Sequence, residues 1–270
     1  MSRTTYAPYM RRDELIEQVE AGAVAVVPTG SLEQHGPHLP VGTDSLLAEA
    51  VVREGVDVAA RAGTPAVAFP ALWTGFSPHH VPLGATVSLS KETLVALLDD
   101  VCSSLLEIGF DRVLLVNGHG GNRPAVSLVA GDVGTRQHEA DVAEIDYNTL
   151  ARERFEELRS GESGSAYHAG EFETSLMLHL HGEHVAADAA TDDPATPATD
   201  YSSRDMFSGG PLGMRRTYDF LTEDGVRGEP TSGTAAVGAA LFEAATEGLA
   251  DVIAAVRSLE RDRRHHPGTD

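Results

Sequence analysis

This 270-residue sequence predicts an α/β fold in which a mostly parallel sheet is covered by helices. Short, continuous apolar runs alternate with longer segments in which apolar residues recur at helical spacing. Gly, Pro and polar residues separate the two kinds of segment. Strands that alternate with helices are typical of parallel sheets, because a parallel pair needs a crossover connection between its strands.

The first four elements lie before residue 70. Residues 13–20 have the spacing of a short helix, and the apolar run 23–27 predicts a buried strand that Pro28 ends. Residues 45–62 are apolar at helical spacing and follow a Thr-Asp pair, which is typical of a helix start. Residues 65–69 predict a second short strand.

The middle of the chain repeats this pattern. Ser90 is a typical N-cap for a helix over 90–108. The run 111–116 contains VLLV, which is too apolar for an exposed edge and predicts an interior strand. A helix over 124–137 and a strand over 141–145 follow.

The last part of the chain is less regular. Helices are expected over 149–159 and, after the Gly/Ser-rich GESGSAYH, over 170–180. Residues 185–232 are rich in Asp, Thr, Pro, Ser and Gly, which predicts long loops with room for one short hairpin. A helix over 233–261 closes the fold.

The composition limits the classes of partner. The net charge is −21, and no apolar run approaches the roughly 18 residues that would span a bilayer. Such an acidic surface repels nucleic acid and anionic lipid, so we expect neither as a partner. Lys91 is the only lysine, and an acidic, lysine-poor surface is typical of a protein from a halophile.

Three further features concern organisation. The beginning of the sequence has arginines without an apolar stretch after them, so we expect no secretory signal and a cytoplasmic location. Cys102 is the only cysteine and lies in an apolar-periodic segment, which predicts a buried structural thiol. With no internal repeat or linker, one domain over 1–262 is expected, followed by a disordered tail at 263–270.

Acidic and histidine side chains gather directly after the first predicted strand, in TGSLEQHGPHLPVGTD. This segment contains Glu33, His35, His38 and Asp44 in a stretch broken by Gly and Pro. Carboxylate oxygens and imidazole nitrogens without a nearby thiolate suit zinc, manganese or ferrous iron held for hydrolysis, whereas a structural zinc more often uses cysteine. The segment therefore indicates a metal-dependent enzyme.

Two more polar clusters follow. NGHGGN places His119 after the strand 111–116, and HAGEFETS contains His168, Glu171 and Glu173. Because ligands bind at the carboxyl ends of strands in open parallel sheets, we expect the first cluster and His119 to converge.

Each cluster also has a purely structural interpretation. Glu33 could cap a turn, His35 could be a solvated loop residue, and Asp44 could be an ordinary helix N-cap. NGHGGN could be a plain strand-to-helix turn, although its glycines permit close approach to a ligand and positive φ at Asn117 or Gly120. The recurrence of such clusters at successive strand ends favours a metal site.

Five motifs, in this order, resemble the creatininase family of metal-dependent amidohydrolases: GSLEQHGPHLPVGTD, SPHHVPLGAT, NGHGGN, HAGEFETS and GVRGEPTSGTA. The resemblance covers residues from about 20 to 250. It implies a three-layer α/β/α fold with a mostly parallel central sheet, two divalent metal ions per chain (zinc, manganese or ferrous iron) and a homohexamer.

The resemblance also implies metal ligands. By position, Glu33 and His119 would bind one metal ion, His35 the other, and Asp44 would bridge the two. Family members that open creatinine carry a further ligating glutamate where this chain has Gly121.

Glu171 is the expected replacement for that missing carboxylate, because it lies one helical turn from His168. Glu173 points elsewhere on a helix, so we assign it a supporting catalytic role, with ligation of the second metal as its alternative. His168 matches a catalytic histidine of the family, and its ordinary pKa near neutrality suits a general acid/base. A histidine at a helix start that only supports the metal site is the alternative for His168.

The expected substrate is a small-molecule amide. His79, Gly120 and Gly121 would line its pocket by resemblance. Arg215 and Arg216 would bind a phosphate group, because planar guanidinium groups contact phosphate in a bidentate manner; a solvated loop pair or a subunit salt bridge is the alternative.

NGHGGN and HAGE look more like the branch that includes an archaeal formamide deformylase, acting on a ribosylaminopyrimidine phosphate in flavin and deazaflavin biosynthesis, than like true creatininase. This branch fits a haloarchaeal source. A creatinine amidohydrolase is one alternative, although Gly121 and the lack of tryptophan near the fourth motif count against it. A cofactor-maturation peptidase and a non-catalytic metal- or ligand-binding relative are the others. Histidines without a role above, His80 among them, are expected to be structural or on the surface.

Overall fold

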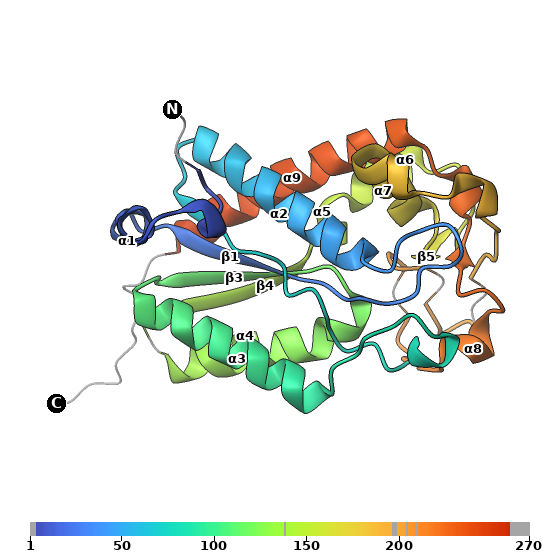
Figure 1. Cartoon of the computed structure of the whole chain (residues 1–270), viewed down its shortest axis with the longest axis horizontal. Helices are drawn as coiled ribbons and strands as arrows, with labels where there is room; N and C mark the ends of the chain where they lie inside the picture. The colour runs from blue at the N-terminus through green and yellow to red at the C-terminus, as the bar shows by residue number, and fades with distance from the viewer. Residues whose placement is uncertain (1–3, 138, 196–198, 204, 209, 260–270) are drawn as a thin grey trace.

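The chain folds into three layers, with a parallel sheet between two layers of helices (Figure 1). The structure, a computed structural model, describes residues 4–137, 139–195, 199–203, 205–208 and 210–259. The predicted α/β class with a parallel central sheet is confirmed. The expected tail at 263–270 lies outside the described residues.

The central sheet has the strand order β2, β1, β3, β4, and all its strands run parallel. β3 is an interior strand, as its apolar sequence predicted. Thr29 pairs with Asn117, so β1 and β3 end at the same edge of the sheet. The four strands are β1 Val24–Thr29, β2 Ala66–Ala68, β3 Arg112–Asn117 and β4 Asp141–Asp146.

β1 continues through Pro28, which we expected to end it. Pro28 pairs in register with Val116, and its carbonyl oxygen accepts a hydrogen bond from the Leu72 N–H at 3.0 Å. A proline lacks only the N–H donor, so a strand can continue where that donor is not needed.

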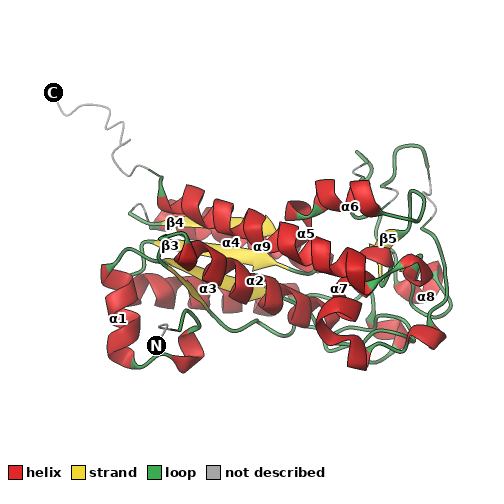
Figure 2. Ribbon diagram, turned by 90° about the horizontal axis from the view of Figure 1, so that it is seen from above, coloured by secondary structure: helices red, strands yellow, loops and turns green. Residues whose placement is uncertain are grey.

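Helices cover both faces of the sheet. α2 (Thr43–Arg61), α7 (Glu171–His181) and α9 (Ala235–Arg257) lie on one face, and α3 (Lys91–Ile108) and α4 (Arg123–Arg136) lie on the other (Figure 1). α9 packs against both α2 and α7, and the arrangement is seen from above in Figure 2.

Alternation along β1 divides the core in two. Val24 and Val26 point toward α2 and α9, whereas Ala25 and Val27 point toward α3 and α4, and each is at most 1% exposed. Burying a valine side chain contributes about 1.5–3 kcal/mol, so both faces of this strand stabilise the fold. The continuous apolar run in the sequence reflects burial on both sides.

The shorter helices depart from the sequence expectation at one place. The helix expected over 149–159 is interrupted at the fully buried Ala151, which has φ −99° and ψ 6°. Two helices result, one on each side of this residue. The remaining helices are α1 Arg12–Glu20, α5 Tyr147–Leu150, α6 Arg152–Leu158 and α8 Tyr218–Leu221.

A second, two-stranded sheet lies beside the start of α7. β5 (Ala166–His168) pairs antiparallel with β6 (Arg227–Gly228). The sequence predicted a hairpin within 185–232, but that segment instead supplies one strand to the Gly/Ser-rich stretch before α7. This pairing positions His168, the last residue of β5.

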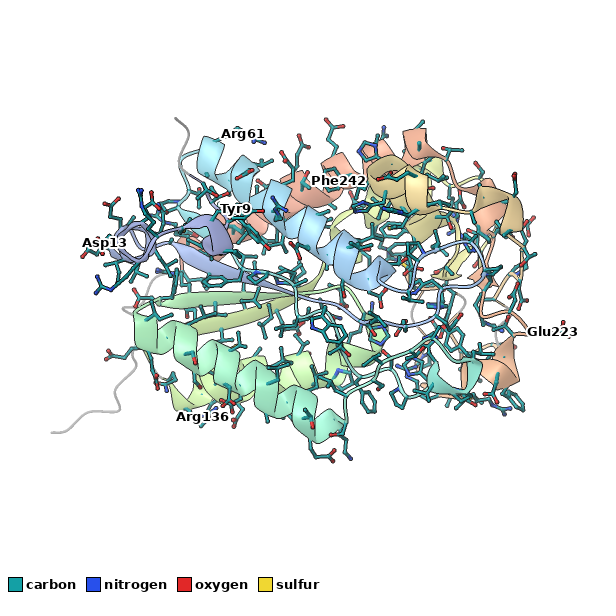
Figure 3. The ribbon with its side chains drawn as sticks, in the orientation of Figure 1. Tyr9, Asp13, Arg61, Arg136, Glu223 and Phe242 are labelled. Carbon is teal, nitrogen blue, oxygen red and sulfur yellow. The ribbon has the colours of Figure 1, made fainter. Side chains whose placement is uncertain are left out.

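The exterior is charged and the interior apolar. Asp13, Arg61 and Glu223 lie on the outside of the molecule (Figure 3). Cys102 is fully buried as expected, and burial raises the pKa of its thiol to about 11. No helix within the described ranges is long and apolar enough to cross a bilayer.

Candidate metal centre

Six acidic and histidine side chains from separate parts of the chain meet near the carboxyl edge of the sheet. Each residue is at most 8% exposed, so the cluster is buried. Its members lie in the loop after β1, at the first turn of α2, after β3, at the end of β5 and at the start of α7. They are Glu33, His35, Asp44, His119, His168 and Glu173, and they form three overlapping groups of potential metal ligands.

The first group consists of Glu33, Asp44 and His119. His119 Nδ1 lies 3.3 Å from Glu33 Oε2 and 3.0 Å from Asp44 Oδ2. Its other ring nitrogen, Nε2, lies 3.2 Å from the carbonyl oxygen of Phe76. A carbonyl can only accept, so Nε2 carries the proton and the Nδ1 lone pair faces two carboxylates. That arrangement needs a cation or a second proton between the three side chains.

The second group consists of His35, Asp44 and Glu173. His35 Nδ1 donates to the carbonyl oxygen of Glu33 at 3.1 Å, and its Nε2 lies 3.2 Å from Asp44 Oδ1. The Glu173 carboxylate accepts a hydrogen bond from the Ala169 N–H at 2.6 Å. Burial raises the pKa of Glu173 to about 7, and Asp44 adds to the rise although His35 opposes it. Asp44 is thus shared between the first and second groups.

The third group consists of Glu33, His35 and His168. His168 Nε2 donates to the carbonyl oxygen of Gln34 at 2.9 Å, and its Nδ1 lies 3.8 Å from Glu33 Oε1. Burial, His35 and His80 hold the pKa of His168 well below its usual value. His168 is therefore neutral at pH 7, with a free lone pair on Nδ1.

The residues present fit divalent metal ions. His35 Nε2 and Asp44 Oδ2 are buried and have no hydrogen-bond partner in the described part of the chain. Burial alone would lower the pKa of His35, but Asp44, Glu173 and Glu33 raise it to about 10. The pKa of His119 is also raised well above its usual value by Glu33 and Asp44, against the effect of burial. The cluster thus requires positive charge, and carboxylate and imidazole donors suit zinc, manganese or ferrous iron.

Glu171 does not reach this cluster, which corrects the expectation that it completes the second metal shell. Its carboxylate accepts hydrogen bonds from the backbone N–H groups of Ser160 at 2.6 Å and Gly161 at 3.1 Å, and from the Ser165 hydroxyl at 3.1 Å. Glu171 and Glu173 are two positions apart on α7, so they point to different sides of the helix. Glu173 is the one on the side of the metal-ligand groups.

His80 lies in the site, although we expected a structural or surface residue. It is 1% exposed, and its Nε2 donates to Glu33 Oε1 at 3.2 Å. Its Nδ1 accepts from Gln34 Nε2 at 2.8 Å, and its ring stacks on Tyr218 with centroids 3.9 Å apart. The sequence does hold a signal, because His80 follows β2, which ends at the same edge of the sheet as β1.

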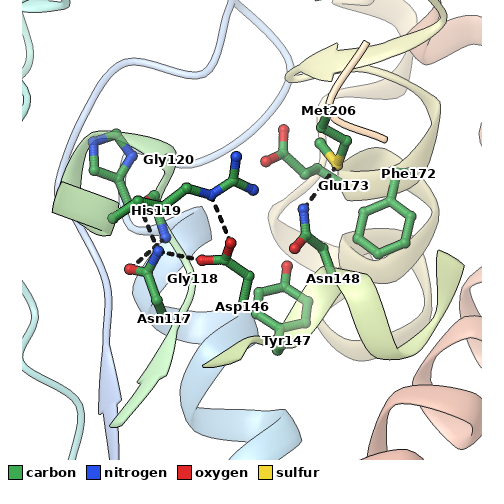
Figure 4. A pocket seen from close by; sticks show the side chains of 11 residues that line it. Asn117, Gly118, His119, Gly120, Asp146, Tyr147, Asn148, Phe172, Glu173 and Met206 are labelled. Atoms are coloured by element: carbon green, nitrogen blue, oxygen red, sulfur yellow. Dashed lines mark hydrogen bonds and ion pairs between the residues drawn. The ribbon is translucent and has the colours of Figure 1, made fainter. Parts of the chain in front are cut away.

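His79 and Gly120 also lie near the first group. The ring of His79 stacks on that of His119, with centroids 5.7 Å apart and an interplanar angle of 13°. Gly120 lines a small pocket beside His119 and Glu173 (Figure 4). Neither Asn117 nor Gly120 has the positive φ that the glycine-rich motif allowed.

The two arginines expected to bind phosphate lie outside this pocket. Arg215 and Arg216 are both exposed, and the Arg216 guanidinium lies over the Phe220 ring, 4.2 Å from its centroid. Burial lowers the pKa of His79, and the charge of Arg215 adds to this effect, so Arg215 is within electrostatic reach of the site.

Gly121 occupies a position with no room for a side chain. A Cβ there would lie 2.3 Å from the Phe76 carbonyl oxygen and 2.4 Å from His119 Nε2. These are the two atoms of the hydrogen bond that orients the His119 imidazole. A glutamate at this position could not ligate a metal without a rearrangement of the loop.

Gly121→Ala is therefore expected to displace the His119 ring and weaken metal binding about tenfold or more, as loss of a group that orients a ligand typically does. Gly120→Ala is the matched control, because a Cβ at Gly120 has no heavy atom within 4 Å. Metal titration by calorimetry measures both. Equal affinities for the two variants would contradict the expectation.

The comparisons with known proteins agree with this geometry. The sequence model of the creatininase family, described as creatinine amidohydrolase, matches residues 8–253. The mycofactocin precursor peptide peptidase of Mycolicibacterium smegmatis is 34% identical over 232 residues, which cover 85% of this chain and 84% of that protein. The creatinine amidohydrolase of Pseudomonas putida is 29% identical over 272 residues, 94% of this chain and 97% of that protein.

The fold is also similar to a solved structure described as the manganese form of creatininase. The TM-score is 0.74 at 26% identity, and the match covers 93% of this chain and 98% of that chain. The family match spans nearly the whole described fold, including every residue of the three metal-ligand groups. The chain belongs to the creatininase family, whose members are metal-dependent amidohydrolases that act on carbon–nitrogen bonds.

Proposed function

We propose that this protein hydrolyses an amide carbon–nitrogen bond with two divalent metal ions. Glu33, Asp44 and His119 would hold one ion, and His35, Asp44 and Glu173 the other. The observation that carries the proposal is the position of Asp44 between two imidazoles, each of which has its outer nitrogen bound to a backbone carbonyl. Two such ions, when bound, activate water and polarise the carbonyl of the substrate.

His168 is the residue that we propose to move the proton. Its Nδ1 carries a lone pair and lies on the Glu33 side of the cluster, 3.8 Å from Oε1. Because its pKa is well below the usual value, it is neutral before reaction and can accept a proton. It then donates that proton to the departing nitrogen. The Gln34 carbonyl holds the imidazole in this tautomer.

Two substrate classes are supported by different observations. The motif pattern NGHGGN and HAGE supports a formamide, as in the deformylase acting on a ribosylaminopyrimidine phosphate. The 34% identity to a precursor peptide peptidase supports a peptide amide. Creatinine is disfavoured, because the structure leaves no space for a carboxylate at Gly121.

Metal-dependent turnover tests this proposal. The metal-free chain is loaded separately with zinc, manganese and ferrous iron and assayed for formate release, for cleavage of short peptides and for creatinine opening. We expect hydrolysis of a formamide or a peptide that needs added metal and is abolished by a chelator. If metal is bound and none of the three substrates is turned over, a binding role replaces the enzymatic one.

Several broader expectations stay predictions from the sequence and the family resemblance. They are the homohexamer, the cytoplasmic location, the haloarchaeal source and the absence of nucleic acid and membrane partners.

A further inference from the structure

A small pocket adjoins the proposed metal centre on the side of β4. His119 from the first group and Glu173 from the second both line it, so a molecule in this pocket would contact the centre. Asp146, Asn148 and Met206 form other parts of its wall (Figure 4).

Arg123 is the only arginine or lysine among the described residues that line this pocket. Its Nε pairs with Asp146 Oδ2 at 2.6 Å, and Asp146 Oδ1 accepts from Asn117 Nδ2 at 2.6 Å. Asn117 ends β3 and Asp146 ends β4, so the edge of the sheet holds the guanidinium in place. Its side chain is 44% exposed.

The ion pair uses only one side of this guanidinium. Within the described ranges, the two terminal nitrogens of Arg123 have no hydrogen-bond partner or carboxylate contact. A guanidinium presents its N–H groups as a planar fork that matches a carboxylate or phosphate. Arg123 is thus oriented by Asp146 and still has donors for an anion.

Asn148 adds a second unused group. Its Nδ2 contacts only the Met206 sulfur at 3.3 Å, a weak acceptor, and its Oδ1 is buried without a donor in the described part of the chain. A buried acceptor without a partner is unfavourable, and an N–H group of a ligand would satisfy it. The pocket thus offers donors for an anion and an acceptor for an amide N–H.

We propose that Arg123 binds an anionic group of the substrate, a carboxylate or a phosphate, and so selects acidic amides. This inference rests on the proposed amidohydrolase function. It gives an acidic chain of net charge −21 a fixed cation where the substrate must enter, in place of Arg215 and Arg216.

Binding of matched probes to the metal-loaded, full-length chain tests the inference. N-formylglycine carries a carboxylate, N-formylaminomethylphosphonate carries a phosphonate, and N-formylglycinamide is neutral. Calorimetry measures the Kd of each, and formate release is followed in parallel. Arg123→Gln is expected to raise the Kd of the anionic probes about tenfold or more, because a hydrogen bond to a charged group is lost, and to leave the neutral probe nearly unchanged. Comparison of the two anionic probes distinguishes a carboxylate from a phosphate source.

Arg136→Gln is the matched control. Arg136 lies at the other end of α4 and pairs with Asp99 at 2.7 Å and Asp132 at 3.0 Å on the outer surface (Figure 3). It should change none of the three Kd values. Arg123→Lys keeps the charge without the planar fork and should give a smaller rise for the anionic probes.

The outcomes separate this inference from the proposed function. Equal effects of Arg123→Gln on all three probes, or no binding of either anionic probe to the unaltered chain, would overturn the role of Arg123. Formate release from all three probes at similar efficiency would also overturn it while leaving the amidohydrolase intact. Arg123-dependent anion binding without any hydrolysis would support the inference and count against the enzymatic function.

Discussion

Asp44→Asn should leave the chain folded but reduce its bound metal from two ions to at most one, and lower kcat/KM by about a hundredfold or more. Asp44 faces His35 Nε2 at 3.2 Å and His119 Nδ1 at 3.0 Å, so it serves both proposed metal ions. Asparagine has nearly the same volume but no charge, and its neutral amide is a poorer ligand for a divalent cation. Changes that only disturb a ligand's hydrogen-bond partner typically cost 10–100-fold, and a shared ligand should cost at least as much.

Glu54→Gln is the matched control for this variant. Glu54 lies on the same helix, α2, and its side chain is 41% exposed, with a surface ion pair to Arg61. Metal counting by atomic absorption and circular dichroism should find it unchanged in both metal content and fold. Two tightly bound ions per chain in the Asp44 variant would refute the bridging role.

Glu173→Gln is expected to lose the second metal ion and most activity, whereas Glu171→Gln is expected to keep both ions and lose stability. Glu173 lies with His35 and Asp44, so its charge is needed for the second ion. Glu171 accepts hydrogen bonds from Ser160 and Gly161, far from those side chains. Loss of its charge should lower the free energy of unfolding by about 1.5–3 kcal/mol.

The two glutamates control for each other, because they lie on the same helix and are both buried. Metal content and denaturant unfolding are measured on both variants with saturating metal in the buffer. The opposite result, with metal lost only from the Glu171 variant, would restore the ligand that the sequence first favoured.

Much of the fold could be predicted because its signals are local. The continuous apolar runs indicate strands buried on both faces, and their alternation with helices indicates a parallel sheet. Parallel neighbours end at one edge, so Glu33 and His119 could be expected to meet, and the structure brings them within 3.3 Å. The ligand types of that edge follow from residue chemistry alone.

The choice between Glu171 and Glu173 could not be made in the same way. It depends on the rotation of α7 about its axis, which is set by packing of Phe172 and Leu176 in the core. No local pattern records that rotation. His80 was missed because the loop between β2 and α3 has no periodicity, and its path over the sheet edge is set by distant contacts such as the ring of Tyr218.

The backbone carbonyls of Glu33 and Phe76 fix which nitrogen of His35 and of His119 is left free. These acceptors belong to the main chain, so replacing a neighbouring side chain does not remove them. The sequence around the cluster can therefore change to suit different amides while the two imidazoles keep their orientation. In such an architecture, substrate preference and metal retention are separable traits, which makes the pocket a suitable target for redesign.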